Sequence, residues 1–257
     1  LITGAGGFVG SHLINYLFLK KLNVKGIIRN INPPYLNKKI KIIKADLTKI
    51  KTNIGDYDCI IYCAVEEPGI KNFLKVKENN IKDINNIFKY TKKLKQFIYL
   101  SSMAVYGENK NKFIYENSSI NKQTKYGKIK YEIEQLCIKK SKKHNFNLSI
   151  LRLPGVVGFG SKDNFISKTY NSIQNNKIVL ANNPDSFFNN IITSQKLNNF
   201  IYELILKKPE NNIYTFGSKY PLKIKTVISI IAKLLKRKIL VKFLDTKKKP
   251  FLIKYDN

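Results

Sequence analysis

A glycine-rich turn near the start of the chain constrains the fold more than any other feature of the sequence. It reads Thr3-Gly4-Ala5-Gly6-Gly7-Phe8-Val9-Gly10. The apolar pair Leu1-Ile2 before it fits the end of a strand, and the segment that starts at Ser11 fits a helix. Gly4 allows a tight turn, and Gly7 allows close approach of a pyrophosphate. Gly10 allows the helix to pack closely on the sheet. The helix that follows offers N–H groups to the anion. In this context the spacing predicts a dinucleotide-binding turn rather than a plain glycine-rich loop.

Apolar runs of strand length alternate with helical patterns through residue 153, which is typical of βαβ units and a parallel sheet. The runs 59–63 and 97–100 are apolar throughout, as in strands buried on both faces. We therefore predict an α/β fold, with a doubly wound Rossmann sheet in residues 1–153 and a smaller substrate-binding lobe in residues 154–257. The expected strands are 24–29, 40–44, 58–63, 96–101 and 148–153, and the expected helices are 11–20, 79–94, 126–144, 165–173, 195–206 and 226–235.

The formal net charge of +30 suggests nucleic-acid binding, but the residue types argue against it. All but three of the 47 cationic side chains are lysines, and they are scattered along the chain. Surfaces that read bases favour the planar fork of arginine. The partners expected from the charge are therefore anionic small molecules rather than a specific nucleic acid.

Cysteine and histidine counts exclude two further classes. Three cysteines and two histidines provide neither a disulfide framework nor a finger-type zinc site, so no metal is expected. No apolar run approaches the roughly 18 residues that cross a membrane. A cytoplasmic protein is the default expectation. Because the chain starts inside a strand and without Met, we also expect residues upstream of Leu1.

A second constellation combines Ser102 with Tyr126 and Lys130. Tyr-x-x-x-Lys spacing also occurs elsewhere in the chain, but here Lys130 shares a helical stripe with Ile133 and Cys137, which assign the stripe to the sheet. A lysine on a buried stripe is costly unless its charge is used. Such a cation lowers the pKa of a neighbouring phenol and would make Tyr126 a general acid or base. The plain alternative is a solvated tyrosine–lysine pair.

Four motifs in this order resemble the extended short-chain dehydrogenases/reductases, and within them the NAD-dependent epimerase/dehydratase group. The resemblance covers residues 1 to about 200 and implies a Rossmann fold, an NAD or NADP cofactor and a nucleotide-sugar substrate. It also implies a homodimer formed through the helix that carries Tyr126. The motifs are Thr3-Gly4-x-x-Gly7-x-x-Gly10, Asp46-Leu47, Ser101-Ser102-x-x-Val105-Tyr106-Gly107 and Tyr126-Gly127-Lys128-x-Lys130.

The resemblance implies roles for individual residues. Ser102 would hydrogen-bond the sugar oxygen, Tyr126 would move its proton, and Lys130 would hold the nicotinamide ribose and tune Tyr126. Asn164 matches a position that touches the substrate diphosphate. The cofactor-binding residues expected from motifs and resemblance together are Gly4, Gly7, Phe8, Val9, Gly10, Arg29, Asp46, Leu47, Cys63, Ala64, Val65, Asn79, Tyr126, Lys130 and Pro154.

The sugar end of the site departs from the family pattern. Gly155, Asn189 and Lys196 stand where these epimerases usually carry Asn, a diphosphate-gripping Arg and Asp. The residues after the active-site serine are Met103 and Ala104, whereas the family's 4,6-dehydratases place an acid pair there. Neither side chain can move a proton, so we expect no 4,6-dehydratase activity.

These residues predict an NAD(P)-dependent epimerase that acts on a nucleotide-activated sugar through a transient 4-keto intermediate. Tyr126 would take the proton of the C4 hydroxyl while the nicotinamide takes the hydride. Two alternatives stay open. One is an NADPH-dependent 4-ketosugar reductase with the same residues, which would consume cofactor stoichiometrically. The other is a non-catalytic module that binds a dinucleotide or, through its basic surface, RNA.

Arg29 bears on the choice of cofactor. NAD-specific folds usually end the second strand with Asp or Glu, about 20 residues after the glycine turn, and this carboxylate binds the adenosine ribose hydroxyls. Here the segment reads Gly26-Ile27-Ile28-Arg29-Asn30, so a guanidinium that can pair with a 2′-phosphate takes that position. We expect NAD or NADP, with a slight lean toward tolerance of NADP, unless Arg29 stacks on the adenine or points to solvent.

Overall fold

The computed structural model describes residues 1–29, 36–66, 72–108, 112–246 and 251–254. Two compact units divide the chain between them, and each consists of several segments. Unit 1 comprises Leu1–Glu108, Ile120–Leu153 and Ser194–Tyr214, and unit 2 comprises Asn109–Ser119, Pro154–Thr193 and Thr215–Asn257.

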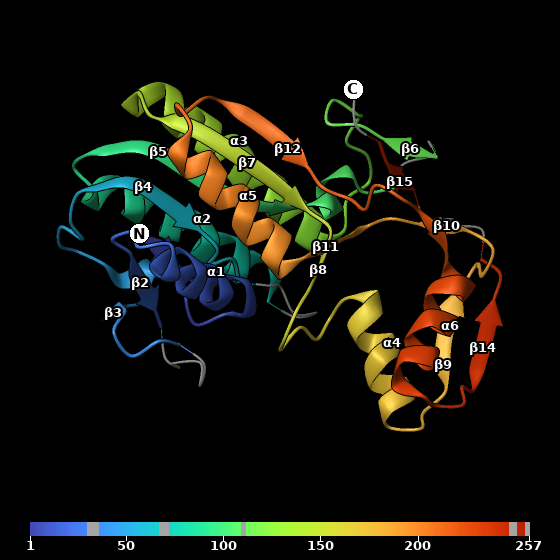
Figure 1. Ribbon diagram of the computed structural model, residues 1–257. Helices are drawn as coiled ribbons and strands as arrows, with labels where there is room; N and C mark the ends of the chain where they lie inside the picture. The colour runs from blue at the N-terminus through green and yellow to red at the C-terminus, as the bar shows by residue number, and fades with distance from the viewer. Residues whose placement is uncertain (30–35, 67–71, 109–111, 247–250, 255–257) are drawn as a thin grey trace. The chain divides into compact units, whose positions relative to one another are not determined.

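Unit 1 is built on a seven-stranded sheet with strand order β12-β7-β5-β4-β1-β2-β3 (Figure 1). Neighbouring strands from β7 to β3 pair in parallel. The strand order reverses beside β1, because the chain builds outward first to β3 and then from β4 to the other edge. The strands are β1 (Ile2–Thr3), β2 (Lys25–Ile28), β3 (Lys41–Lys44), β4 (Tyr57–Tyr62), β5 (Leu94–Ser102), β7 (Asn147–Leu153) and β12 (Asn212–Thr215).

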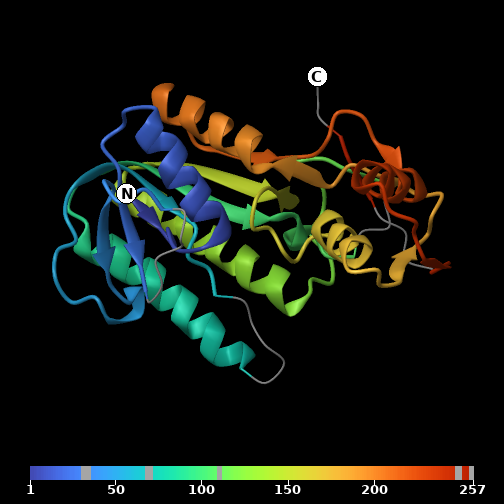
Figure 2. The ribbon, with the colours of Figure 1, turned by 60° about the horizontal axis from the view of Figure 1, so that its bottom comes forward.

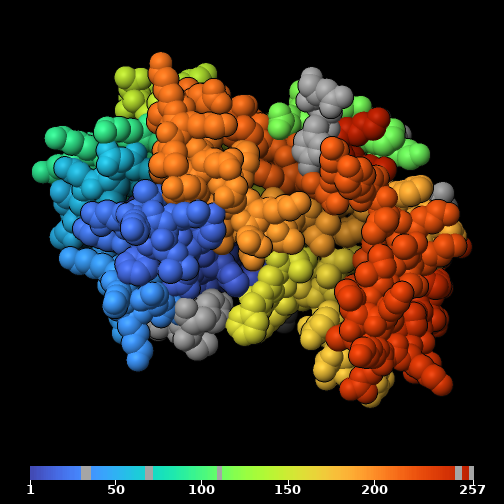
Figure 3. All heavy atoms as spheres, in the orientation of Figure 1, coloured from blue at the N-terminus to red at the C-terminus, as the bar shows by residue number. Residues whose placement is uncertain are grey.

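Helices cover both faces of this sheet (Figure 2). Helices α1 and α5 pack together on one face, and α2 and α3 pack together on the other. Figure 3 shows the surface of α5, in orange, directly against that of α1, in blue. The predicted doubly wound α/β fold is thereby confirmed. The bounds are α1 (Phe8–Leu19), α2 (Phe73–Tyr90), α3 (Lys125–His144) and α5 (Ser194–Leu206), with 3₁₀ turns η1 (Leu47–Lys49) and η2 (Met103–Tyr106).

The main core of unit 1 contains aromatic side chains of β4 and β5. Tyr62, Phe97 and Tyr99 are fully buried. The ring centroid of Tyr62 lies 6.2 Å from that of Phe97 and 5.9 Å from that of Tyr99. Burying each such side chain contributes about 1.5–3 kcal/mol. Because β4 and β5 are interior strands covered on both faces, apolar residues are needed at nearly every position.

The described residues of unit 2 form short strand pairs and two helices. Helices α4 and α6 share a small core with the parallel pair β9–β14 (Figure 1). This core contains Ile173, Val179 and Ile228. Its other pairs are β10–β13, β8–β11 and β6–β15. The bounds are β6 (Phe113–Ile114), β8 (Gly155–Val157), α4 (Phe165–Gln174), β9 (Val179–Asn182), β10 (Phe187–Phe188), β11 (Ile191–Thr193), β13 (Leu222–Lys223), α6 (Ile224–Leu235), β14 (Val241–Leu244) and β15 (Leu252–Ile253).

The division into units differs in two places from the expected split of 1–153 and 154–257. Ser194–Tyr214 belongs to unit 1, because α5 packs on α1 and β12 joins the sheet beside β7. Asn109–Ser119 belongs to unit 2, where β6 pairs with β15. The substrate-binding role of unit 2 stays a prediction. Across the described residues, no helix has both the length and the apolar character required to span a membrane.

Candidate functional site

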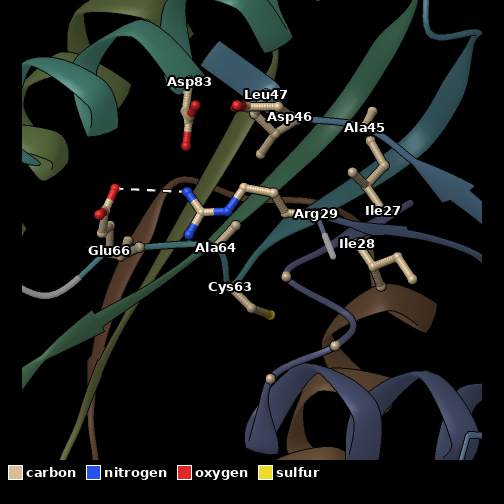
Figure 4. Close-up of a pocket in the computed structure, with 14 residues that line it drawn as sticks. Ile27, Ile28, Arg29, Ala45, Asp46, Leu47, Cys63, Ala64, Glu66 and Asp83 are labelled. Carbon is tan, nitrogen blue, oxygen red and sulfur yellow. Dashed lines mark ion pairs between the residues drawn. The ribbon is translucent and has the colours of Figure 1, made fainter. Parts of the chain in front are cut away.

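A cavity of ≈ 390 Å³ opens at the carboxyl ends of β1, β2, β3 and β4 (Figure 4). Open α/β sheets bind ligands at such ends, in the crevice where the strand order reverses. Eight of the predicted cofactor-binding residues line the cavity, together with side chains that the sequence did not single out. The lining residues are Gly4, Gly6, Gly7, Ile27, Ile28, Arg29, Ala45, Asp46, Leu47, Cys63, Ala64, Val65, Glu66 and Asp83.

The glycine turn forms one wall of the cavity. Gly4 has φ +64°, a left-handed conformation that favours glycine. A Cβ at Gly10 would collide with the carbonyl oxygen of Gly4, so the turn closes tightly on the first turn of α1. Gly7 caps α1, and Phe8 and Val9 are its first residues. The first N–H groups of a helix have no partner within the helix, so the cradle fits a pyrophosphate.

Asp46 and Leu47 form the opposite wall, at the end of β3. The carboxylate of Asp46 accepts hydrogen bonds from the backbone N–H and the hydroxyl of Thr48, at 3.0 and 2.7 Å, and so caps η1. Burial alone would raise the pKa of Asp46. The two hydrogen bonds from Thr48 and the charges of Lys49 and Arg29 outweigh burial and hold this pKa below its ordinary value. Asp46 is therefore a fixed anion at neutral pH.

Arg29 follows β2 and points into the cavity, where its guanidinium faces Glu66 (Figure 4). The Nη1 atom of Arg29 lies 3.8 Å from Oε2 of Glu66. Asn79, a predicted cofactor-binding residue, does not line the cavity itself, but its side-chain amide lies 3.5 Å from the same carboxylate oxygen. Glu66 was not predicted, because it follows β4 and its closeness to Arg29 depends on the strand order.

Asp83, on α2, is the other acid that sequence reasoning missed. Its carboxylate points toward Arg29 (Figure 4). Burial, reinforced by the negative charges of Asp46 and Glu66, raises the pKa of Asp83 to about 7, although the charge of Arg29 opposes the shift. Within the described part of the chain, the buried Oδ1 atom of Asp83 has no hydrogen-bond partner. A carboxyl group so placed in a cavity favours a bound polar ligand.

Lys130 and Tyr126 lie one turn apart on α3. Lys130 is only 6% exposed, and its ammonium donates a 2.8 Å hydrogen bond to the carbonyl of Leu100 at the end of β5. The Nζ atom lies 5.6 Å from the ring centroid of Tyr126 and 5.4 Å from that of Tyr99. The predicted sheet-facing stripe is present, since Ile133 and Cys137 are also buried. The cation is thus held beside the ring of Tyr126.

Ser102 ends β5 and caps η2, its hydroxyl oxygen accepting a 3.2 Å hydrogen bond from the N–H of Ala104. The first turn of α3 packs directly on this segment. A Cβ at Gly127 would collide with the carbonyl oxygen of Ala104, so only glycine permits the approach. Thr124 caps α3 by accepting a 3.1 Å hydrogen bond from the N–H of Gly127. The structure therefore brings the loop of Ser102 against the turn that carries Tyr126.

A buried ion pair lies behind these residues. Arg152, on β7, forms two hydrogen bonds with Glu134 on α3, at 2.7 and 3.1 Å. Ser101 donates to the same carboxylate at 2.5 Å, and Arg152 donates to the hydroxyl of Tyr106 at 3.0 Å. Burial would lower the pKa of Arg152, but Glu134 and Tyr106 raise it. Sequence reasoning did not predict this ion pair. A signal for it was present, because Glu134 lies one turn after Lys130 on the buried face of the helix.

The predicted residues of unit 2 have local structural contacts. Asn164 caps α4, accepting from the N–H of Ser167 at 2.9 Å and donating to the carbonyl of Val156 at 2.9 Å. Asn189, which was expected at the position of the family's diphosphate-binding Arg, is 3% exposed and forms hydrogen bonds with both the N–H and the carbonyl of Ile253. Pro154 is half-buried and begins this part of unit 2. The roles of Asn164 and Pro154 toward ligands stay predictions.

Cysteine chemistry and metal binding have little support in the described residues. Burial raises the pKa of both Cys59 and Cys63 to about 12, so their thiols stay protonated at neutral pH. Cys63 lines the cavity as a small apolar group. No group of three His, Cys, Asp or Glu side chains in the described ranges is arranged to hold a metal ion.

Comparison with known proteins identifies related sequences. Residues 1–188 match the family described as NAD dependent epimerase/dehydratase. An uncharacterised UDP-glucose epimerase of Bacillus subtilis is 31% identical over 179 residues, which are 62% of this chain and 56% of that protein. A dTDP-D-glucose 4,6-dehydratase of Dictyostelium discoideum is 27% identical over 263 residues, covering 86% of this chain and 58% of that protein. The chain therefore spans little more than half the length of these two relatives.

Solved structures with the same fold cover nearly the whole chain. A UDP-glucuronic acid 4-epimerase from Bacillus cereus, in complex with NAD, has a TM-score of 0.83 at 21% identity over 99% of this chain and 86% of that one. A UDP-N-acetylglucosamine 4-epimerase from Methanobrevibacter ruminantium has a TM-score of 0.81 at 21% identity, over 98% and 86%. At this identity the likeness shows the fold. Because the family match extends over residues 1–188 of 257, the chain belongs to the NAD-dependent epimerase/dehydratase family of enzymes.

Proposed function

We propose that this protein is an NAD-dependent epimerase that inverts C4 of a UDP-linked sugar through a transient 4-keto sugar. The observation that carries the proposal is the buried ammonium of Lys130 beside the ring of Tyr126, against the segment that presents Ser102. Names of similar proteins support the substrate class, since they include UDP-glucose, UDP-glucuronic acid and UDP-N-acetylglucosamine epimerases.

The cavity fits the cofactor on two observations, the glycine cradle and the buried, unpartnered Asp83 oxygen within the described chain. The turn at Gly4 and the amino terminus of α1 would hold the pyrophosphate, Asp46 and Leu47 would bind the adenine, and Lys130 would hold the nicotinamide ribose. Bound NAD supplies a reversible hydride acceptor. NAD is proposed because structures of this fold are complexes with NAD.

Proton transfer is assigned to Tyr126. Its phenolate accepts the proton of the C4 hydroxyl and returns it after the 4-keto sugar has turned over. Lys130 stabilises the phenolate by its charge, and its hydrogen bond to Leu100 fixes the ammonium in place. The hydroxyl of Ser102 accepts from Ala104 and can donate its own hydrogen to the sugar oxygen, which orients the reacting carbon.

Elimination of water across C5–C6 is not proposed, although four relatives carry 4,6-dehydratase in their names. That step needs an acid and a base beside the serine. The residues there are Met103, which is buried, and Ala104, and neither exchanges a proton. Mass spectrometry of the products should show no loss of water from the sugar. A 4-keto-6-deoxy product would contradict this assignment.

Replacement of Tyr126 by Phe tests the function. We expect kcat to fall at least 100-fold, because general acid–base catalysis contributes about 10²–10⁴. The assay follows interconversion of UDP-glucose, UDP-glucuronic acid and UDP-N-acetylglucosamine with their C4 epimers, and NAD binding is measured separately. Tyr131→Phe, on the same helix, is the matched control. Full activity of Tyr126→Phe would exclude the assigned role.

The reductase alternative makes a different prediction, because it consumes cofactor with each turnover. An epimerase shows no net oxidation of NADH or NADPH during conversion of its substrate. The resemblance also favours a homodimer formed through α3, and the low cysteine content favours a cytoplasmic location. Sedimentation equilibrium of the purified protein tests the dimer.

A further inference from the structure

Four charged side chains from four elements meet in the cavity (Figure 4). Arg29 follows β2, Asp46 follows β3, Glu66 follows β4, and Asp83 lies on α2. Three carboxylates thus surround one guanidinium. A dinucleotide that carries a further phosphate at this point would therefore meet the three carboxylates as well as the guanidinium of Arg29.

Arg29 is already engaged by a carboxylate. Its Nη1 atom lies 3.8 Å from Oε2 of Glu66, with the two side chains 58% and 36% exposed. Both groups can therefore be reached by a ligand. A phosphate that binds Arg29 must displace Glu66 or accept its repulsion at close range, where two like charges interact strongly.

The backbone of Glu66 is held by the side chain of Asn80, which forms hydrogen bonds with both its N–H and its carbonyl. Its N–H donates to Oδ1 of Asn80 at 2.9 Å, and its carbonyl accepts from Nδ2 of Asn80 at 3.1 Å. Asn80 is fully buried and also donates to the carbonyl of Val76 at 2.8 Å. Asn79 approaches the carboxylate at 3.5 Å. Two residues of α2, Asn79 and Asn80, therefore position Glu66.

Asp83 adds to the negative field of the cavity. Its buried Oδ1 atom has no hydrogen-bond partner among the described residues, and the carboxylate points toward Arg29. The groups that face it are Asp46, Glu66, Arg29 and the hydroxyl of Tyr62. With Asp83 ionised, the charge of the cluster becomes more negative, and a dianionic phosphate is disfavoured further.

We propose that Glu66 is the residue that selects NAD over NADP, by occupying Arg29 and repelling a 2′-phosphate. The acid that NAD-specific folds usually carry at the end of the second strand is thereby supplied from the turn after β4. The inference rests on the dinucleotide site of the proposed function. It replaces the expectation that Arg29 makes the site tolerant of NADP, because a phosphate on Arg29 would meet the charge of Glu66 at close range.

Calorimetric titration of NAD and NADP into the full chain, after removal of copurified nucleotide, tests the proposal without reference to catalysis. The variants are Glu66→Gln, Arg29→Ala and the double variant. Glu78→Gln is the matched control, since Glu78 is an exposed acid on α2 that does not line the cavity. ADP-ribose and its 2′-phosphate serve as second probes that lack the nicotinamide.

We expect the wild type to bind NAD at least tenfold more tightly than NADP. Glu66→Gln should raise NADP affinity about tenfold and leave NAD affinity within about twofold, as expected when one close like charge is removed. Arg29→Ala should abolish this gain in the double variant but change the wild-type ratio little. An unchanged ratio in Glu66→Gln, or equal losses of NADP affinity from Arg29→Ala in both backgrounds, would overturn the proposal.

Other outcomes are also decisive. If neither dinucleotide binds, the cavity is not a dinucleotide site and this inference fails together with it. If selectivity follows Glu66 but no sugar is epimerised, the proposed reaction fails and the inference stands. A smaller gain of NADP affinity is expected for Asp83→Asn at pH 8.5 and none at pH 6, because burial raises the pKa of Asp83 to about 7.

Discussion

Among the described residues of unit 1, two Arg–Glu ion pairs have opposite surroundings. Arg152 and Glu134 are 5% and 0% exposed, and they join through two hydrogen bonds of 2.7 and 3.1 Å. Arg29 and Glu66 are 58% and 36% exposed, with a single contact at 3.8 Å. The first pair ties α3 to β7, whereas the second lies in the wall of the cavity. The same two residue types serve a structural function in one place and face a ligand in the other.

Solvent explains the difference. An exposed ion pair contributes about 0–1 kcal/mol, because water competes for both charges. A buried pair contributes little net stability relative to apolar residues, yet removal of one partner leaves an uncompensated charge in the interior. Mutations should therefore separate the pairs by their effect on folding.

The largest effect is expected for Glu134→Gln. The guanidinium of Arg152 would stay buried without its counter-charge, and Ser101 would lose a charged acceptor. We expect a loss of about 3 kcal/mol in the free energy of unfolding. Urea unfolding followed by circular dichroism measures it, with Glu78→Gln as the control for a surface acid. A loss below about 1 kcal/mol would mean that the two pairs do not differ in kind.

Asp83 shares a feature with each of the two ion pairs. It lines the cavity together with Arg29 and Glu66, yet one of its carboxyl oxygens is buried. Burial, with Asp46 and Glu66, raises its folded-state pKa from 3.8 to about 7. Between about pH 4 and pH 7 the folded state holds a proton that the unfolded state has released, so this group's contribution to stability falls as pH rises.

Asp83→Asn should remove this pH dependence. A pKa shift of this size corresponds to about 4 kcal/mol in full, and partial exposure of Asp83 to water reduces it. Relative to the wild type, the variant should therefore gain stability from pH 4 to pH 8 by on the order of 2 kcal/mol. Urea unfolding at several pH values provides the comparison. If the difference between wild type and variant were independent of pH, the carboxyl group would have an ordinary pKa.

The smallest effect is expected for Arg29→Ala, which removes the cation of the exposed pair. The free energy of unfolding should change by less than about 1 kcal/mol. Thermal unfolding monitored by calorimetry is sufficient, with wild type at the same ionic strength as the reference. A large loss would show that Arg29 supports the fold rather than facing a ligand.

Sequence patterns predicted every strand of the sheet except β12. Continuous apolar runs located β4 and β5 because strands covered on both faces need apolar side chains at consecutive positions. The bounds of α2 were less accurate. The prediction of 79–94 ran past Tyr90, since Leu94 pairs with Tyr57 in the sheet, and it omitted the first six residues of the helix, 73–78. Sheet pairing overrides helical periodicity at such junctions.

Residues of the candidate site were predicted where one motif contains them. The glycine turn, Asp46 with Leu47, and Tyr126 with Lys130 are local patterns with a physical reason for their spacing. Glu66 and Asp83 were missed because their positions in the cavity depend on strand order and on the packing of α2. The path of Ser194–Tyr214 back to the sheet was missed for the same reason.

The contact between Gly127 and the carbonyl oxygen of Ala104 has a consequence for protein engineering. A Cβ at position 127 would meet this oxygen, so a substitution there would push the start of α3 away from the segment after β5. The phenol of Tyr126 and the hydroxyl of Ser102 would then be displaced relative to one another. Libraries that aim to change sugar preference should therefore leave position 127 constant and vary residues elsewhere.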